Sequence, residues 1–444
     1  MRVYTRVKFS FGKREFIIIM ALLLFAFIVR LLFFPLSGYK NDTGVFIYWF
    51  NTAAEHGPRL FYNVVYSELG WIDYPPFNAY IFWAFGSLSN ALSSLLGANV
   101  ITSIIKLPPN LFDMATAFLI FAIVRKRFTF KMGLLAAGLY AFNPAVIFNA
   151  AVWGQFDAIY TFFLVLSLYL FFESKPQWAV VAFMLGVLTK PQSIALAPLV
   201  VFLVFKVYKW NWKGLLISFL AAVGTIFAVI LPFEWSNPVT FLSNIYFGAY
   251  NNYQATSINA FNFWAFGGMW VSDTQTSLLG SPYIIGWVLF AALSLFVLYF
   301  VHRRFGFNSE FIIIFAAFAL FFGFFMLPTR IHERYLFPAM AMLALGFPFL
   351  KRLRPLYIIL TATCFINQAY VLHWLNVYAE AGYSYGPNLS GDPVVLIVSL
   401  INSLAFVYVI MLMFGELRGK RWLGLAPVKP SMNVIEEATQ DEAR

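Results

Sequence analysis

Residues 311–335 read FIIIFAAFALFFGFFMLPTRIHERY, and this stretch combines the two features that decide the fold and the site. Its first part, 311–328, carries no charge and is long enough to cross the hydrocarbon core of a bilayer as a helix. Its last part, from Arg330 to Arg334, is the densest group of charged side chains beside any apolar run of the chain. The stretch therefore predicts a membrane-spanning helix with a candidate site at its end.

The composition extends this prediction to the whole chain of 444 residues, which is 61% hydrophobic, 20% aromatic and 11% charged, with a mean hydropathy of +0.77. A soluble domain has about 25% charged residues, so these values exclude a soluble enzyme, a disordered protein and a nucleic-acid binder. One cysteine excludes a disulfide framework and a cysteine-based zinc site, and four histidines leave little room for a histidine-rich metal site. The chain is predicted to be an all-α polytopic membrane protein.

Long apolar runs divide the chain, and they predict about twelve transmembrane helices. With the N-terminus inside, most of the 30 lysines and arginines fall in the inner segments, as the positive-inside rule requires. The net charge of +11 is therefore a topology signal, and both termini are expected in the cytosol. The apolar runs are 16–36, 101–124, 132–151, 157–172, 177–190, 191–206, 214–233, 282–301, 311–328, 334–350, 355–375 and 394–415.

The predicted organisation is a basic cytosolic N-terminus (1–15), a transmembrane domain (16–415) and a cytosolic tail (416–444). The first apolar run is interpreted as an uncleaved signal anchor, because no small-residue cleavage motif follows it. Two large outer loops, 37–100 and 234–281, interrupt the transmembrane domain.

Two apolar stretches leave their placement in the membrane open. A span at 77–96 would put the basic cluster 125–127 outside, so we expect a helix lying in the outer interface there. A second interfacial helix is expected over 43–55 in the same loop. Residues 177–206 form either two spans or a broken, re-entrant hairpin, because a proline interrupts the apolar pattern.

Polar side chains gather at the predicted outer ends of the spans. In the first outer loop, Asn41 or Asp42 can cap the helix over 43–55, and Asp73 precedes two prolines. Two arginines four residues apart would share a face of a helix, and one glutamate beside them cannot neutralise both. A carboxylate near clustered cations at the depth of lipid headgroups indicates chemistry on a lipid-linked anion. The other candidates are Gln155, Asp157, Lys190, Arg330, His332, Glu333 and Arg334.

These motifs resemble those of the GT-C superfamily, the integral-membrane glycosyltransferases that use polyprenyl-phosphate sugars. The resemblance is to the dolichyl-phosphate-glucose-dependent glucosyltransferases of asparagine-linked glycosylation and to prokaryotic mannosyltransferase-like relatives, and it covers most of residues 16–350. Arg30, Asp42 and the Asp-Tyr-Pro-Pro element at 73–76 match the first-span arginine, the first-loop aspartate and the following motif of that group. Residues 154–158 correspond in place to its Gly-His-Phe-Gln-Tyr turn, although the histidine is missing.

Two further motifs agree in order and in side of the membrane. Thr189-Lys190-Pro191-Gln192 is similar to the Phe-Lys-Gln motif of the family, and His332-Glu333-Arg334 is similar to its His-Glu-Lys motif. The departures are Thr-Gly after Asp42 and an acidic Asp157 where the family has a neutral residue. They leave the sugar and the acceptor open, but not the class of reaction.

The resemblance implies an inverting transfer of a hexose, mannose or glucose, from a polyprenyl-phosphate sugar to an acceptor hydroxyl at the outer or lumenal face. Asp42 is then the general base, because a phosphate leaving group needs no proton and one carboxylate suffices. Fixed cations stabilise the leaving phosphate, and we assign this role to Arg330, His332, Arg334 and Lys190. Four further residues are expected to contact the acceptor or to support the site: Asp73, Gln155, Asp157 and Glu333.

No cofactor is expected, although Asp42 and Asp73 are suitable ligands for Mg²⁺ or Mn²⁺. The acceptor is open between a lipid-linked glycan, a glycolipid, a polymer and a protein. The predicted membrane is the plasma membrane in a prokaryote and the endoplasmic reticulum in a eukaryote. The main alternative is a lipid or sugar transporter or flippase, which would place charges in mid-span rather than at one edge. A non-catalytic scaffold is the third interpretation.

Each candidate also has a purely structural interpretation. Asp42 and Asp157 are suitable helix caps, and Asp73 is suited to ordering the Pro-Pro turn. Lys190 can extend to the outer surface, and Glu333 can pair with a neighbouring arginine. Within the spans, an ion pair between Arg30 and Asp113 is interpreted as structural.

Overall fold

The computed structural model describes residues 12–251, 253–276, 280–305, 309–383, 388–420 and 422–423. Within these ranges the regular secondary structure is helical. β-structure is limited to isolated bridges between 255 and 272 and between 258–259 and 332. Most of the predicted basic N-terminus and cytosolic tail lies outside the described residues. An all-α membrane protein is therefore confirmed as the fold class.

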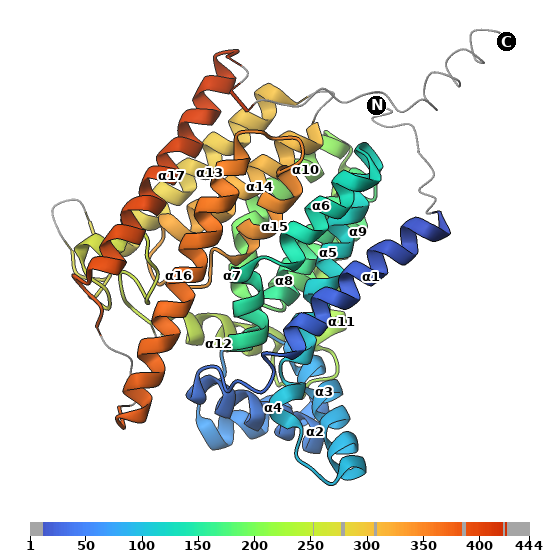
Figure 1. The fold of residues 1–444 in the computed structure, drawn as a ribbon, viewed down its shortest axis with the longest axis vertical. Helices are drawn as coiled ribbons and strands as arrows, with labels where there is room; N and C mark the ends of the chain where they lie inside the picture. The colour runs from blue at the N-terminus through green and yellow to red at the C-terminus, as the bar shows by residue number, and fades with distance from the viewer. Residues whose placement is uncertain are drawn as a thin grey trace.

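The helices form a tall bundle with a smaller helical layer at one end (Figure 1). We term the end that carries this layer the site face. The helices of the bundle are α1 (Lys13–Leu31), α5 (Leu107–Arg127), α6 (Phe130–Ala141), α7 (Pro144–Ile147), α8 (Asp157–Phe172), α9 (Pro176–Val187), α10 (Ala197–Tyr208), α11 (Trp212–Ile230), α13 (Pro282–Arg304), α14 (Ser309–Met326), α15 (Phe337–Gly346), α16 (Leu353–Glu380) and α17 (Pro393–Leu417).

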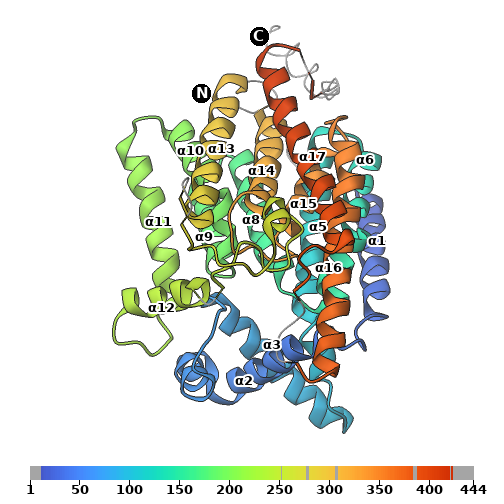
Figure 2. The same cartoon turned by 90° about the vertical axis from the view of Figure 1, so that its left-hand side faces the viewer.

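The layer at the site face consists of short and interfacial helices (Figure 2). Three irregular helical segments connect the longer elements: a π-helical turn at Phe148–Trp153 and 3₁₀ segments at Pro191–Leu196 and Phe263–Gly267. The helices of the layer are α2 (Lys40–Leu69), α3 (Phe77–Leu96), α4 (Ile101–Ile104) and α12 (Pro238–Asn251).

Seven of the described helices are long and apolar enough to cross a membrane, or eight if a bent pair counts as one span. The bent pair is Phe130–Ala141 with Pro144–Trp153, which meet at 46°. Three shorter apolar helices, α8, α9 and α15, and the charged-ended α1 occupy the other predicted runs. The predicted count of twelve spans is therefore not confirmed, although every predicted run is helical. The seven are 101–127, 191–208, 212–230, 282–304, 309–326, 353–380 and 393–417.

The apolar run that opened the sequence analysis becomes the central helix of the bundle. All residues of α14 from Ser309 to Met326 are buried, because α13, α15 and α17 surround it. A helix that is hydrophobic all round is stable only when it is enclosed in this way. Its end at Met326 leads directly into the charged segment 329–335, which fixes that segment at the middle of the site face.

The interfacial helices differ from their predicted form in two details. The first helix begins at Lys40 and runs to Leu69, with a break at Gly57, whose φ is +68°. No side chain caps its start, because Tyr39 occupies the cap position, so the predicted cap role of Asn41 or Asp42 is wrong. The predicted helix over 77–96 is present as α3, which is not among the apolar spans and packs along α2.

An aromatic core joins this layer to the bundle. Trp49 and Phe50 of α2 pack against Phe82 of α3, with ring centroids 5.7 and 5.2 Å apart. Phe156, in the turn before α8, contacts the rings of Phe46, Phe50 and Phe82 at 5.1 to 6.2 Å. A Cβ on Gly86 would collide with the carbonyl oxygen of Phe50, so the close approach of α2 and α3 requires glycine there. The layer is therefore fixed relative to the bundle.

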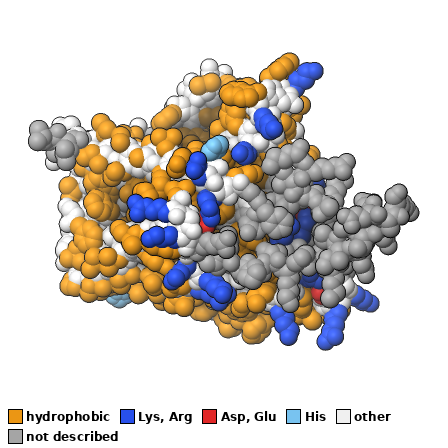
Figure 3. All heavy atoms as spheres, turned by 90° about the horizontal axis from the view of Figure 1, so that it is seen from above, with side chains coloured by type: hydrophobic (Ala, Val, Ile, Leu, Met, Phe, Trp, Pro, Cys, Tyr) orange, Lys and Arg blue, Asp and Glu red, His pale blue; other side chains and the backbone are white. Residues whose placement is uncertain are grey.

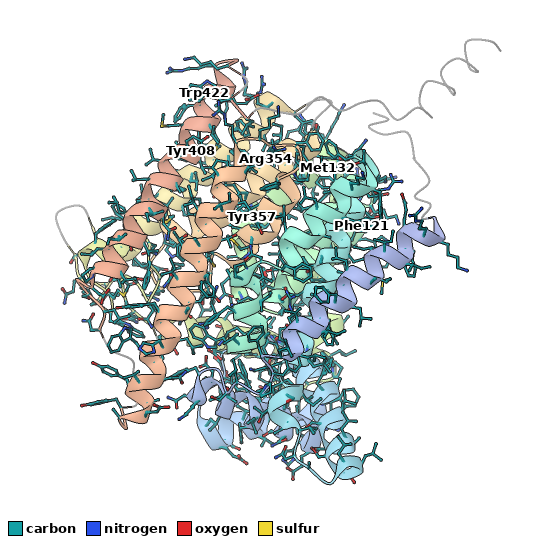
Figure 4. All side chains as sticks on the ribbon, in the orientation of Figure 1. Phe121, Met132, Arg354, Tyr357, Tyr408 and Trp422 are labelled. Carbon is teal, nitrogen blue, oxygen red and sulfur yellow. The ribbon has the colours of Figure 1, made fainter. Side chains whose placement is uncertain are left out.

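The opposite end of the molecule is rich in lysine and arginine (Figure 3). Ion pairs at this end include Arg127 with Glu310, at 2.6 Å, and Arg304 with Glu416, at 2.5 Å. Figure 4 places Arg354 and Trp422 towards the same end and Tyr357 inside the bundle, where its hydroxyl donates to the carbonyl of Leu139. This charge distribution agrees with the prediction that the site face is the outer one.

Candidate functional site

A cavity of about 1430 Å³ lies at the site face between the interfacial layer and the bundle. Its walls come from α2, the loop before α3, the segments around 153–155 and 190–192, α12 and the segment 329–335. Asp157 lies behind the wall and is completely buried. The structure thus brings one group of residues to the cavity surface from five separate parts of the sequence: Asp42, Asp73, Gln155, Lys190, Arg330, His332, Glu333 and Arg334.

Asp42 lies in the first turn of α2, where the helix dipole favours a negative charge. Its Oδ2 accepts hydrogen bonds from the indole nitrogen of Trp153, at 3.0 Å, and from Nε2 of Gln155, at 2.7 Å. Burial raises the pKa of Asp42, while Arg334, Lys190 and the two hydrogen bonds act in the opposite direction. Both bonds fall on one oxygen, and the other oxygen points to no described partner.

The two donors to Asp42 are held by the irregular end of the bent span. The π-helical turn ends at Trp153, and Gly154, with φ +83°, reverses the chain so that the backbone N–H of Gln155 donates to the carbonyl of Asn149. The buried ammonium of Lys106 donates to the carbonyl of Val152 at 3.1 Å. A Cβ on Gly38 would lie 2.5 Å from the carbonyl oxygen of Trp153. The close approach of the segment before α2 to Trp153 therefore requires glycine at position 38.

Lys190 and Arg334 share the buried carboxylate of Asp157. Lys190 Nζ lies 3.1 Å from Oδ1 and Arg334 Nε lies 3.7 Å from Oδ2, while Asn149 donates to Oδ2 at 3.2 Å. Asp157 does not cap α8, because Phe156 holds the cap position without a side-chain bond, so the predicted cap role is wrong. Lys190 does not extend to the surface, because its side chain is buried against this carboxylate.

The two cations differ in strength. Burial lowers the pKa of Lys190, although Asp157 raises it. Burial also opposes the charge of Arg334, but Glu333 and Asp157 together raise its pKa well above the ordinary value. Arg334 Nη1 lies 2.5 Å from Glu333 Oε1, as the structural interpretation of Glu333 predicted. Arg334 is therefore a permanent cation, and Lys190 is a weaker one.

Arg330 faces a carboxylate that the sequence analysis did not identify. Its Nε and Nη2 lie 2.8 and 3.2 Å from the two oxygens of Asp273, which is the only acidic residue in 235–281. The guanidinium also lies between the rings of Tyr250 and Tyr283, at 4.5 and 4.6 Å from their centroids. The planar fork of Arg330 is thus occupied by protein groups.

The predicted shared helical face of Arg330 and Arg334 is wrong. Arg330 has a φ of +64°, and α15 begins only at Phe337, so the segment between is not helical. The two side chains therefore diverge, one to Asp273 and the other to Asp157. Glu333 alone does not neutralise both arginines, as predicted from the sequence. The additional carboxylates, Asp273 and Asp157, come from distant parts of the chain.

His332 and the remaining carboxylates line the same wall. The ring of His332 lies 5.4 Å from that of Tyr253, and Nδ1 is 3.8 Å from Glu333 Oε2. Burial, Arg334 and Lys190 lower the pKa of His332 well below its ordinary value, so the imidazole is neutral at neutral pH. It can donate one hydrogen bond but adds no positive charge.

Asp73 is a second carboxyl group at the cavity with an oxygen that lacks a partner among the described residues. Its buried Oδ1 has no hydrogen-bond partner within the described chain. Burial raises the pKa of Asp73 to about 6, against the opposing effect of Lys190 and Arg334, and burial also raises the pKa of Glu333. Among the described residues, no group of three or more His, Cys, Asp or Glu side chains is placed to hold a metal ion. A reaction without metal stays a prediction.

The side of the cavity towards α11 and α12 is apolar. It is formed by side chains that project from α9, α11, α12, α13, α14 and the 3₁₀ segment 191–196. These are Met184, Val187, Ile194, Ile226, Leu242, Phe247, Trp287 and Phe324. A molecule with a charged head and a long apolar tail matches this combination of surfaces.

An all-helical membrane fold with a cavity that joins carboxylates, cations and an apolar surface fits an enzyme acting on an amphipathic anion. Residues 73–235 match the family described as dolichyl-phosphate-mannose-protein mannosyltransferase. The matched segment contains Asp73, Gln155, Asp157 and Lys190, but neither Asp42 nor the segment 329–335. The match confirms the predicted resemblance to the GT-C glycosyltransferases and the predicted class of enzyme.

The solved structures that are similar to the chain include the following two. One is ArnT from Cupriavidus metallidurans bound to undecaprenyl phosphate, with 16% identity, 92% of this chain and 79% of that chain covered, and a TM-score of 0.46. The other is the oligosaccharyltransferase of Archaeoglobus fulgidus in the apo form, with 13% identity, 92% and 56% covered, and a TM-score of 0.36. No curated protein matches the chain.

Proposed function

We propose that this protein is an inverting glycosyltransferase. It transfers mannose or glucose from a polyprenyl-phosphate sugar to an acceptor hydroxyl at the site face, which is the outer or lumenal face of the membrane. The observation that carries the proposal is the placement of the Asp42 carboxylate, held by Trp153 and Gln155, in one cavity with the cations Lys190 and Arg334. The family match to mannosyltransferases supports it.

In the proposed reaction, the free oxygen of Asp42 takes the proton of the acceptor hydroxyl. The acceptor oxygen forms a bond to the anomeric carbon while the bond from that carbon to the phosphate oxygen breaks, and the bonding electrons leave with the phosphate. The leaving group carries additional negative charge but needs no proton. Arg334 and Lys190 stabilise that charge, because fixed cations act strongly in a site from which water is largely excluded.

The donor is proposed to lie with its phosphate at Lys190, His332 and Arg334 and with its polyprenyl chain along the apolar side of the cavity. Neutral His332 contributes a hydrogen bond and not a charge. We revise the role of Arg330, whose fork is filled by Asp273: it holds the segment 329–335 in place instead of binding phosphate. If Mg²⁺ or Mn²⁺ takes part, Asp42 and Asp73 would hold it.

The test is a transfer assay in lipid nanodiscs with polyprenyl-phosphate mannose and polyprenyl-phosphate glucose as donors. Extracted membrane lipids serve as acceptors, and the variant Asp42→Asn is compared with the wild type. Glu55→Gln is the matched control, because Glu55 lies on the same helix, is exposed and does not line the cavity. Transfer by the wild type and the control, with a loss of about 10²–10⁴-fold in Asp42→Asn, supports the proposal.

Transfer at the same rate by Asp42→Asn would remove this residue from the mechanism. A transporter would tolerate the substitution and would move labelled lipid across proteoliposomes without forming product. Where no product forms, binding of radiolabelled polyprenyl-phosphate mannose provides the second readout. Equal donor binding by the wild type and by Arg334→Met would contradict the proposed phosphate site.

A further inference from the structure

The cavity has a second side, which differs in chemistry from the apolar one. It is formed by the start of α2, the outer end of α16 and the loop 253–273, while α11 and α12 lie on the other side of the molecule (Figure 2). Beside Asp42, Leu375 and Ile258, the lining of this second side consists of neutral amides and aromatic rings: Tyr39, Asn41, Tyr253, Asn259, Trp270 and Asn388. The nearby Lys40 does not line the cavity and is paired with Glu380 at 3.0 Å.

Trp270 is the most exposed large ring on this side, with 42% of its surface accessible. Its indole N–H donates to Asn259 Oδ1 at 2.9 Å, and its ring meets that of Tyr253 edge-on at 6.3 Å. The partner ring of Tyr253 in turn contacts His332. The indole therefore has a fixed orientation while one surface stays open to the cavity.

The backbone at this place is held in an unfavourable conformation. Trp270 has a φ of +57° and Asn259 a φ of +63°, and together with Arg330 they are three of five non-glycine residues with positive φ among those described. Such a conformation is unfavourable for a non-glycine residue and persists where surrounding contacts enforce it. Here the backbone N–H of Trp270 donates to the carbonyl of Ser257 at 3.1 Å.

All three of these strained residues line the cavity, whereas the other two, Ser174 and Lys209, do not. Strain of this kind concentrates at sites where side chains are held ready for a ligand. A bulky aromatic residue gains nothing from the left-handed region by itself. The loop therefore holds the indole at the cavity surface at an energetic cost, and we infer that the indole contacts a ligand in the cavity.

We propose that Trp270 is a platform on which a sugar ring of the acceptor stacks, and that the acceptor is an uncharged carbohydrate chain. The inference rests on the proposed transferase function, which it makes more specific. The C–H face of a hexose packs against the electron-rich face of an indole, and its hydroxyls match the amides of Asn41 and Asn388 and the hydroxyl of Tyr39. A phosphorylated acceptor would need an unpaired cation, and this side of the cavity has none among its described residues.

The test measures acceptor binding separately from transfer. The wild-type protein in lipid nanodiscs, free of sugar-based detergent, is titrated with mannotriose and with maltotriose, and bound ligand is followed by saturation-transfer NMR. Mannose 6-phosphate and a serine- and threonine-containing peptide represent the phosphorylated and protein acceptors. We expect a saturation-transfer signal from at least one neutral trisaccharide and none from the other two probes.

Four variants locate the binding. Trp270→Ala should weaken trisaccharide binding about tenfold, and Trp270→Phe, which retains an aromatic face, should weaken it less. Phe263→Ala is the matched control, because Phe263 is an exposed ring of the same loop that does not line the cavity. Phe266→Ala, which alters a second exposed ring of this loop outside the cavity, should also bind the trisaccharide like the wild type. Thermal unfolding of each variant shows whether it is folded.

Equal binding by Trp270→Ala and the wild type would overturn the inference. Binding of neither trisaccharide, or preferential binding of the phosphorylated sugar or the peptide, would also overturn it. Failure of the proposed function is a separate result. If a trisaccharide binds at Trp270 but is never glycosylated, the carbohydrate site is supported and the transferase function is contradicted. If transfer depends on Asp42 but is unchanged in the Trp270 variants, the transferase function is supported and the carbohydrate site is contradicted.

Discussion

The guanidinium of Arg330 and the carboxylate of Asp273 form a bidentate ion pair, with distances of 2.8 and 3.2 Å. It joins the loop 253–273 to the segment 329–335, and both line the cavity. Thr329 donates a further hydrogen bond to the same carboxylate at 2.8 Å, and the backbone N–H of Arg330 donates to the carbonyl of Ala255. Asp273 is fully buried. The loop that presents Trp270 and the segment that presents Arg334 are therefore positioned by one contact.

Breaking this ion pair should loosen both loops together. We expect Asp273→Asn and Arg330→Gln each to lower the free energy of unfolding by about 3–5 kcal/mol, because each leaves a buried charge without its partner. The double variant should lose less than the sum of the two losses. Thermal or denaturant unfolding in detergent measures this, and strictly additive losses would show that the pair does not act as a unit.

The hydrogen bonds from Trp153 and Gln155 should set the acidity of the proposed base. Both bonds favour the ionised form of Asp42, so removing either donor raises the pKa of that carboxyl. In Gln155→Leu or Trp153→Phe, the acid limb of the pH profile of kcat/KM should move to higher pH by about one unit. Gln177→Leu, which alters a glutamine bonded to Tyr208 instead, is the control. An unmoved acid limb would separate Asp42 from the titration that controls the rate.

Asp157 should matter for the donor as well as for stability. Asp157→Asn leaves Lys190 and Arg334 without their shared counter-ion, and we expect a loss of about 3–5 kcal/mol in the free energy of unfolding. Asp157 also raises the pKa of Lys190, so the variant should hold a larger fraction of this lysine uncharged. Donor binding by the variant is then expected to fall more steeply than that of the wild type as the pH is raised. Parallel pH dependences would contradict the proposed role of Lys190.

Asp73 should make stability depend on pH in a predictable direction. Burial raises the pKa of Asp73 from 3.8 to about 6, so the folded protein binds this proton more tightly than the unfolded chain. Its contribution to stability is complete below pH 3.8 and is lost as the pH rises to about 6. The asparagine variant lacks this titration, and it should gain in Tm relative to the wild type across that interval. Scans of Tm against pH measure the difference, and a constant difference would be inconsistent with the raised pKa.

A buried ion pair inside the bundle should be structural only. Arg30 Nη2 lies 3.6 Å from Asp113 Oδ2, as the sequence analysis predicted, and the hydroxyl of Tyr140 donates to Asp113 Oδ1 at 2.8 Å. Asp113→Asn should lower stability by about 3–5 kcal/mol, and Arg30→Met with Asp113→Leu should restore part of it. At a temperature where all variants are folded, KM for the donor should be unchanged. A changed KM would assign the pair a role in the site.

The positions of the helices were largely predictable, because each depends on a local property. A run of about twenty apolar residues is helical in a bilayer wherever it occurs, and every predicted run is a helix in the structure. The breaks near 142 and 190 were marked by prolines in the sequence. The number of spans was less predictable, because α8, α9 and α15 are short and depend on neighbours that cover their ends.

The members of the candidate site were predicted from residue type and position, but their partners were not. Asp273 was missed because a single aspartate in a loop of neutral residues carries no local pattern. Its isolation among 235–281 was the one available signal. Trp270 was not predicted as a site residue, since its positive φ and its exposure are properties of the folded chain.

The sequence by itself determined that the protein is a helical membrane protein, because hydrophobicity and length act on each segment independently. It also determined which charged residues reach one face, because helices of known length alternate sides. Only the tertiary structure decided that Gln155 donates a hydrogen bond to Asp42, 113 positions away, and that Asp273 pairs with Arg330, 57 positions away. Such pairings depend on distances of about 3 Å between segments far apart in the chain, and packing of the whole bundle sets those distances.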